Sequence, residues 1–375
     1  MSRARKRAIF PLPHCFGTRA EAFVVAATAT LLRRHTQQEF DRHNLATRVR
    51  VWLAIAIAGV AFTLASCGGG GSSDTAAGVK YTAVAMAGEL LDYTVDATNL
   101  TYTYTITESQ FGLNGKTGSG TLTRNLDGSY SPSGIPNARI VILPNGLLLG
   151  AVRERFGSAI VTVPIIGLSN PVTDVAAIRG DYNYIHRNCA LSVCGASHGT
   201  FQINANGTWT SCRDGNIGGG GSCAGTATNG TLVSLGNGLW RVMDGGSTNI
   251  GTAIGFNSGG QNVVIVDLKD TRPGGFGIGM LVGGQQTPMT TAQTDGMWIA
   301  GSSTGNWAVF TASGANITVN VFDGIAVNAT TTFTADSPWI GMATTAQGGV
   351  GFLAGTGVYV LETANGHAEL GVKLR

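Results

Sequence analysis

The sequence predicts an all-β protein, and three observations carry this prediction. Apolar and polar residues alternate with a period of two, most clearly in residues 99–107, where large apolar side chains alternate with threonines. This alternation is typical of a half-buried strand. The chain holds 56 glycines and only 12% charged residues, a composition that favours many turns over salt-bridged helices. No segment has the 3.6-residue period of an amphipathic helix.

Further strand candidates follow along the chain, joined by dipeptides that tolerate the positive φ of tight hairpins. The strand candidates are residues 121–124, 139–143, 160–163, 181–186, 200–204, 231–235, 239–243, 263–267, 296–300, 307–312, 317–321, 332–334, 350–353 and 358–362. The turn pairs are Asp127-Gly128, Asn145-Gly146, Asn206-Gly207, Asn237-Gly238 and Asn365-Gly366. We expect an antiparallel β-sandwich or a barrel-like domain, and the pattern alone leaves both open.

The β region is expected to have two parts. A small β unit, residues 80–163, precedes a linker over residues 164–178 and a larger β domain, residues 179–375. The boundary rests on Pro164 and Pro171, which flank a short apolar segment and are disfavoured in a central strand. The larger part has enough strands to close into a barrel or to form two packed sheets.

Five Gly-x-aromatic pieces recur without a fixed period. We interpret each as the start of a hairpin whose aromatic side chain fills the core, and the alternative is a row of rings that stacks on carbohydrate. The five aromatic residues are Trp209, Trp240, Trp298, Trp307 and Tyr359.

Basic residues are concentrated near the N-terminus. The whole chain has 24 basic and 21 acidic residues, of which residues 1–66 hold ten and three, so fourteen basic and eighteen acidic residues remain from Cys67 onward. The body is therefore acidic. Nucleic-acid binding needs Lys and Arg clustered on the folded domain, so we expect no nucleic-acid partner.

Residues 51–66 form an uncharged apolar stretch after Arg48 and Arg50. A positive region followed by an apolar region and small residues is the layout of a secretory signal. As a helix the stretch would span roughly 24 Å, less than the ~30 Å core of a bilayer. We therefore expect a cleaved signal peptide over residues 47–66.

The signal ends in Leu64-Ala65-Ser66 and is followed by Cys67. These residues resemble the lipobox of bacterial lipoproteins, which signal peptidase II cleaves before the cysteine. The resemblance implies that Cys67 is the acylated first residue of the mature protein, and two or three acyl chains anchor a protein durably. Residue 68 is Gly, not the Asp that favours inner-membrane retention in that family, so the resemblance implies the outer membrane. The alternative, a chance match in a buried helix, conflicts with the Gly/Ser run that follows.

Residues 67–79 are expected to be a lipidated flexible tether between membrane and body, which would face either the periplasm or the cell surface. Residues 1–46 precede a signal that normally lies at the N-terminus, and their apolar run, residues 22–32, is too short to span a membrane. We expect the true translation start at Leu45 or Val49, so that residues 1–46 are a misassigned extension. A peptide from residues 1–44 in the cell's proteome would count against this.

Four cysteines remain in the body, an even number that predicts two disulfides in an exported domain. They are Cys189, Cys194, Cys212 and Cys223. Three pairings are possible, and we favour Cys189 with Cys194 and Cys212 with Cys223 because each closes a short loop. The alternative is a zinc site that adds His186 or His198, but the spacing lacks a CxxC pair and an oxidising compartment disfavours free thiolates. We expect no metal.

His186 and His198 flank the first cysteine pair, with Asp181 and Asp214 near them in sequence. An acid–base constellation could be built from them, yet no H-E-x-x-H or G-x-S-x-G motif accompanies them. We interpret both histidines as exposed loop residues, and we expect no catalytic residues and no cofactor.

The sequence thus predicts a non-enzymatic binding or structural module of the cell envelope, with the membrane as its partner through the lipid anchor. Two alternatives remain. One is an envelope enzyme with an unrecognised site, which a pocket that gathers His186, His198 and an acid would favour. The other is an integral outer-membrane β-barrel component, although the strand candidates are mostly shorter than the roughly ten residues such strands need.

Overall fold

A computed structural model describes the body of the chain. It covers residues 78–375 except 157–158, 191–192, 218–222, 224–225, 273–274 and 354–356. The expected extension, signal peptide, lipobox and nearly all of the tether lie outside the described residues, so these remain predictions. Within the described part, no helix is both long and apolar enough to cross a bilayer.

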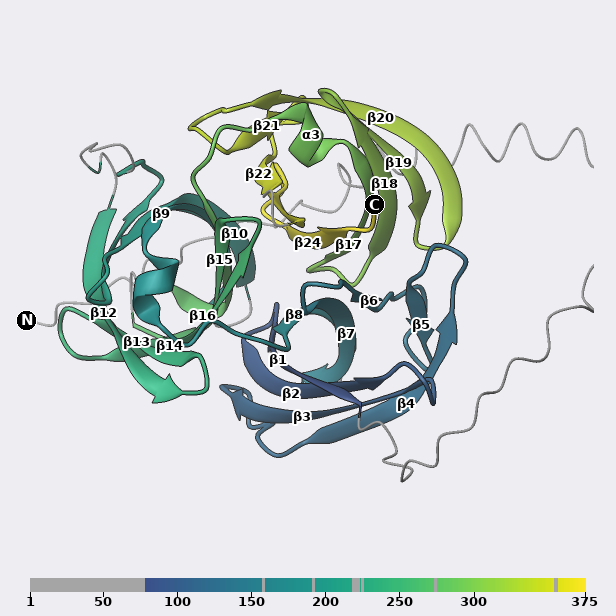
Figure 1. Cartoon of the computed structure of the whole chain (residues 1–375), viewed down its shortest axis with the longest axis horizontal. Coiled ribbons are helices and arrows are strands. Elements are labelled where there is room, and N and C mark those ends of the chain that lie inside the picture. The colour runs from purple at the N-terminus through teal and green to yellow at the C-terminus, as the bar shows by residue number, and fades with distance from the viewer. Residues whose placement is uncertain are drawn as a thin grey trace, which may run out of the picture. The chain divides into compact units, whose positions relative to one another are not determined.

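The body consists of three eight-stranded antiparallel sheets, two of which close into barrels (Figure 1). In each sheet most strands pair with their neighbours in sequence, which is the arrangement that successive tight hairpins produce. The all-β prediction is confirmed, in its barrel form.

The first sheet has the order β5-β4-β3-β2-β1-β8-β7-β6. Its strands are β1 (Val79–Ala85), β2 (Glu89–Asp96), β3 (Thr101–Ser109), β4 (Thr117–Arg124), β5 (Tyr130–Pro132), β6 (Val141–Ile142), β7 (Leu147–Phe156) and β8 (Ala159–Leu168). A single bridge between Tyr130 and Ile140 joins its two edges, so the sheet curls nearly into a barrel. The alternation expected for residues 99–107 appears in β3, where Tyr102 and Ile106 are buried and Thr103 and Thr107 are exposed.

The second and third sheets are the closed barrels. The second barrel contains β9 (Gly180–Ala190), β10 (Val193–Ile203), β11 (Thr208–Arg213), β12 (Thr226–Gly236), β13 (Leu239–Asp244), β14 (Asn249–Ser258), β15 (Gln261–Asp270) and β16 (Gly277–Gln285). The third contains β17 (Gly296–Ser302), β18 (Trp307–Ser313), β19 (Asn316–Phe322), β20 (Ile325–Ala335), β21 (Ala343–Thr345), β22 (Val350–Leu353), β23 (Val358–Glu362) and β24 (Ala368–Lys373). The segment expected to be one larger domain, residues 179–375, thus holds two barrels.

The first part of the expected linker, residues 164–178, belongs to a strand. Pro164 lies in β8 and pairs with Ala151 of β7. On its other side, β8 begins to pair with β1 only at Ile165. A proline is tolerated there because it lacks only an N–H that this side of the strand does not need for the ladder. The connection to the second barrel runs over residues 169–179.

A short helix precedes each closed barrel, η1 (Val175–Ile178) before β9 and α3 (Thr291–Thr294) before β17. In both cases an aromatic residue near the start of the first strand donates a hydrogen bond to the last carbonyl of the helix. The Tyr182 hydroxyl donates to Ile178, and the Trp298 indole N–H donates to Thr294 at 2.9 Å. The two barrels therefore begin with the same arrangement, in which an aromatic residue of the first strand hydrogen-bonds to the end of the preceding short helix.

The three sheets share one apolar core as well as having interiors of their own. Strand β15 shows how, because alternate residues of a strand face opposite sides. Val264 and Val266 belong to the interior of the second barrel. Val263 and Ile265 belong to a cluster that also includes residues of the first sheet and the third barrel. Strand β15 is thus buried on both faces, which explains its continuous apolar sequence.

Candidate functional site

All five aromatic residues of the Gly-x-aromatic pieces are buried, each with at most 6% of its surface exposed. The glycine that begins each piece has a positive φ, between 75° and 143°, which a residue with a Cβ adopts only under strain. The glycine makes the turn and the aromatic side chain fills the core. The prediction of hairpin starts with buried rings is confirmed, and these rings are closed to carbohydrate.

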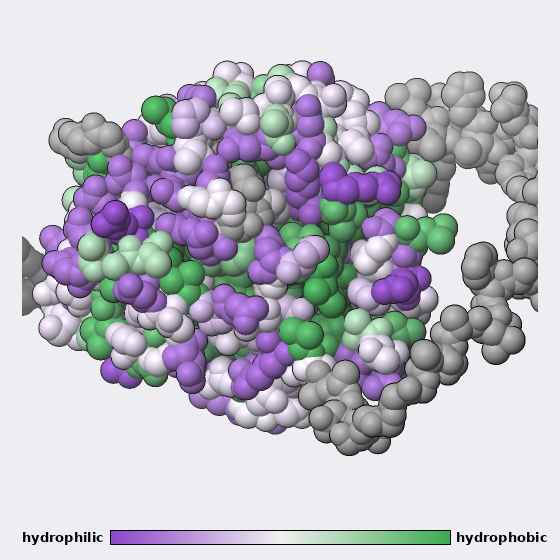
Figure 2. All heavy atoms as spheres, in the orientation of Figure 1, coloured by the Kyte–Doolittle hydropathy of each residue, from purple (hydrophilic) through white to green (hydrophobic). Residues whose placement is uncertain are grey.

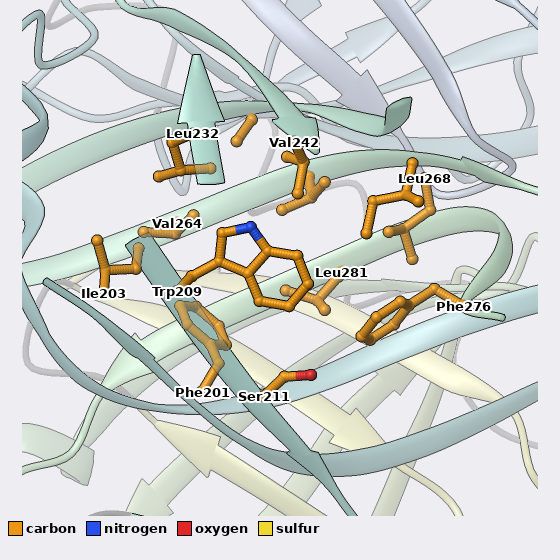
Figure 3. A pocket seen from close by; sticks show the side chains of 13 residues that line it. Phe201, Ile203, Trp209, Ser211, Leu232, Val242, Val264, Leu268, Phe276 and Leu281 are labelled. Carbon is orange, nitrogen blue, oxygen red and sulfur yellow. The ribbon is translucent and has the colours of Figure 1, made fainter. Parts of the chain in front are cut away.

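The interior of the second barrel is filled by its own side chains (Figure 3). The indole of Trp209 lies among Phe201, Phe276, Leu268 and other apolar side chains. The cavity left between them measures about 50 Å³, roughly enough for one or two waters. Because its lining is almost entirely apolar, we assign this interior to the folded core and not to a ligand site.

His186 lies inside this barrel as a buried, neutral group. It is 1% exposed, and its Nδ1 lies 3.0 Å from Oγ of Ser197. Burial, together with the nearby charge of Arg213, lowers the pKa of His186 to about 3. The Arg213 guanidinium lies over the ring of Phe276, 5.5 Å from its centroid. His186 therefore stays uncharged at physiological pH.

His198 projects from the opposite face of the same sheet. The cross-strand partner of His186 is Ser197, and successive residues of a strand alternate between faces. His198 Nδ1 lies 2.7 Å from Oε2 of Glu362 in the third barrel. The imagined acid–base constellation is therefore not formed. The interpretation of both histidines as exposed loop residues is also wrong, because both lie in strands, one inside a barrel and one half-buried against a neighbouring barrel.

The two acids of that expected constellation, Asp181 and Asp214, have other positions in the structure. Asp181 accepts a hydrogen bond of 2.8 Å from the side-chain amide of Gln202. Asp214 sits at a turn with a φ of 54°. Among the residues that the structure describes, no cluster of His, Cys, Asp and Glu could hold a metal ion.

Cys212 and Cys223 form a disulfide with a Cα–Cα distance of 5.5 Å, so this half of the expected pairing is confirmed. Cys189 and Cys194 are directly opposite each other in the β9–β10 hairpin. Their side chains lie outside the described part of the structure, and their bond stays a prediction. The register is the one that the predicted bond requires, because disulfide-bonded residues need Cα atoms within about 7 Å.

The third barrel contains the larger cavity, of about 240 Å³. Its walls are aromatic and aliphatic, and three of its rings are buried to at least 93%. These rings belong to Phe310, Phe333 and Tyr359. Its polar lining includes the exposed Gln347 and half-exposed threonines. The exposed members place the rim of the cavity at the surface.

Among the described residues that line this cavity, Glu369 is the one that carries a charge. The Tyr359 hydroxyl donates a hydrogen bond of 2.9 Å to Oε2 of Glu369. Burial raises the pKa of Glu369, and the bond from Tyr359 partly offsets this. Burial also raises the pKa of Tyr359 well above its ordinary value. The phenol therefore keeps its proton and remains the donor.

A second group of acids is buried between the first sheet and the second barrel. Glu89, Glu154 and Asp267 are at most 3% exposed, and the carboxyls of Glu89 and Glu154 interact with each other. Burial raises the pKa of Glu89 and of Glu154 and brings that of Asp267 to about 8, while the charge of Arg187 opposes the rise at both glutamates. Because these carboxyls are not accessible to solvent, we assign them a role in the stability of the fold and not in ligand binding.

Exposed apolar side chains on the body come from separate places in the chain. They include Leu126, Ile160, Ile325 and Ile340. On the face in Figure 2, hydrophobic residues are interspersed with hydrophilic ones. Apolar residues scattered in this way are ordinary for a protein surface, so the cavity of the third barrel remains the best candidate site.

The sequence pattern did not indicate Glu369 or the buried acids as functional or buried groups. The available signal was weak, namely an acidic residue at an apolar position of a strand. Asp267 interrupts the apolar run of residues 263–268, and Glu369 lies in β24. A solvated acid on an edge strand gives the same pattern, so only the three-dimensional pairing distinguishes the two.

The chain matches no known family model, and no curated protein is significantly similar to it in sequence. Among solved structures, it is similar to a protein of unknown function of the DUF3598 family from Nostoc punctiforme, at 8% identity over 79% of this chain and 94% of that one, with a TM-score of 0.17. It is also similar to a luciferin-regenerating enzyme, at 12% identity over 80% and 93% of the two chains, with a TM-score of 0.13. TM-scores this low support no conclusion about fold or function.

Proposed function

We propose that this protein is a lipid-anchored protein of the bacterial cell envelope and acts there as a non-enzymatic binding module for small molecules. The single observation that carries the binding role is the cavity of about 240 Å³ inside the third barrel. Small-molecule sites are concave, mostly apolar and supplied with a few polar groups. This cavity has aromatic walls, a polar rim and one acid, Glu369.

The proposed location rests on the leader. The lipobox-like sequence that ends in Cys67 follows an apolar stretch, and a Gly/Ser run follows it. The Cys212–Cys223 disulfide supports export, because disulfides persist in oxidising compartments outside the cytoplasm. The enzyme alternative loses its main support, since His186 and His198 face opposite sides of one sheet.

Expression of the whole chain with Cys67 changed to Ser tests the anchor. We expect the native chain to incorporate labelled palmitate and to fractionate with membranes. The Cys67→Ser variant should incorporate none and leave the membrane fraction. Ser72→Ala, in the expected tether close to Cys67, provides the matched control and should behave as the native chain. Membrane association that survives Cys67→Ser would contradict the proposed anchor.

The same membranes test the binding role. The protein is isolated under non-denaturing conditions, and the small molecules that leave it on denaturation are identified by mass spectrometry. We expect a molecule that is absent from a cavity-filled variant, Val319→Trp, whose larger side chain would occupy the cavity. Equal release from both proteins would mean that the cavity is not the site.

A further inference from the structure

The residues that line the cavity of the third barrel limit the chemical class of ligand that it can bind. This inference rests on the proposed function. Its aromatic rings are packed closely, with the centroids of Phe310 and Tyr359 5.1 Å apart and their planes 62° apart. The face of an aromatic ring carries partial negative charge and attracts cations. Walls of this kind accept either an apolar group or an organic cation.

The charge of the residues that line the cavity distinguishes between an apolar group and an organic cation. Glu369 is acidic, and no lysine, arginine or histidine lines the cavity among the described residues. Tyr359 hydrogen-bonds to Oε2 of Glu369, while no described residue hydrogen-bonds to Oε1. One carboxylate oxygen is thus available to a ligand. An anionic ligand would meet a like charge without a compensating base.

The size of the cavity sets the size of the ligand. An apolar cavity of about 150 Å³ suffices to hold benzene, and this one measures about 240 Å³. It accommodates one aromatic ring or a comparable aliphatic body with a short substituent.

We propose that the third barrel binds a small organic amine as a monovalent cation. Its apolar body would lie among Phe310, Phe333 and Tyr359, and its ammonium group would donate a hydrogen bond to Glu369. A cation–π contact and a charge-assisted hydrogen bond in a desolvated site would both favour the amine over a neutral molecule of the same shape.

The proposal implies that binding depends on pH. Burial raises the pKa of Glu369 in the empty cavity. An ammonium group favours the charged carboxylate, so binding would release a proton, and the affinity for the amine would increase from pH 5 to pH 8. The other titratable groups that act on Glu369 are Tyr359 on β23 and His367, which immediately precedes β24.

Calorimetric titration of the full chain in lipid nanodiscs tests the proposal, with empty discs as the blank. The probes are benzylamine and ethylbenzene, which have the same shape but differ in charge. We expect benzylamine to bind at least about tenfold more tightly than ethylbenzene. We expect the Glu369→Gln variant to lose this preference while it still binds ethylbenzene.

Glu362→Gln is the matched control, because Glu362 lies on β23 but pairs with His198 outside the cavity. It should keep the preference for benzylamine. A pH series on the unaltered chain and on His367→Gln makes the test independent of whether Glu369→Gln folds. In both proteins, benzylamine should bind more tightly at pH 8 than at pH 5.

Two outcomes would overturn the proposal in distinguishable ways. If ethylbenzene binds the native chain as tightly as benzylamine at pH 8, the cavity is a binding site but the amine assignment is wrong. If neither probe binds, both the amine assignment and the proposed binding role of the cavity fail.

Discussion

At the scale of single residues, the buried carboxyls between the first sheet and the second barrel link stability to pH. Glu89, Glu154 and Asp267 all have raised pKa values because they are buried. In the folded state they hold protons that the unfolded chain releases. Stability should therefore fall as the pH rises from the ordinary range of these acids toward their raised pKa values, by at most about 1.4 kcal/mol per pH unit and group.

Replacing Glu89 with Gln isolates this effect, since the amide has the shape of the neutral acid. At pH 5 we expect the variant and the native chain to differ by less than about 0.5 kcal/mol in the free energy of unfolding. At pH 9 the variant should be more stable by about 1 to 3 kcal/mol, because it has no proton to lose. Urea-induced unfolding of both proteins at pH 5 and at pH 9 measures these free energies of unfolding.

Asp92→Asn provides the control for the same experiment. Asp92 is 41% exposed and pairs with Lys80, so its loss should give no gain in stability at pH 9. A native chain equally stable at pH 5 and pH 9 would contradict the account of the buried acids.

At the scale of the elements, the disulfide covalently links the end of β11 to the loop that leads to β12. It joins Cys212 and Cys223, which are 11 positions apart. Closing a loop of this length stabilises a fold by about 3 kcal/mol in the chain-entropy model. We expect the double variant Cys212→Ala, Cys223→Ala to be less stable by about 2 to 3 kcal/mol, as measured by thermal unfolding. An unchanged melting temperature would show that the bond adds no stability.

Strands could be predicted from the sequence because their signal is local. The alternation in β3 and the turn glycines of the Gly-x-aromatic pieces are visible within ten residues. Barrel closure could not be predicted, because it depends on pairs far apart in the chain. Cys189 of β9 lies opposite Ile278 of β16, and no local pattern specifies that register. Tyr359 and Glu369 are only ten positions apart, in the β23–β24 hairpin, but a hairpin pattern alone does not show which face of the strand lies inside a barrel.

At the scale of the whole body, the shared core makes the three sheets depend on one another. Ile265 of the second barrel and Ile299 of the third belong to the same cluster as Leu91 of the first sheet. Separation of the sheets would expose this apolar surface, at a cost of about 25 cal/mol per Å². The sequence suggested two parts with a linker, because a strand that is apolar on both faces gives no sign of which sheet it covers.

We expect the body to unfold in a single cooperative transition as a consequence of this shared core. Differential scanning calorimetry of the mature protein should give one peak, with a calorimetric enthalpy close to the van't Hoff enthalpy. Three resolved peaks would show that the sheets are energetically independent.

The central claim is that the interior of the third barrel receives a small molecule. A crystal of the full chain soaked with iodobenzene tests this most directly, because the iodine atom is located by its anomalous signal. The account predicts iodine among Phe310, Phe333 and Tyr359. Iodine found only elsewhere, or a cavity closed by these side chains, would contradict it.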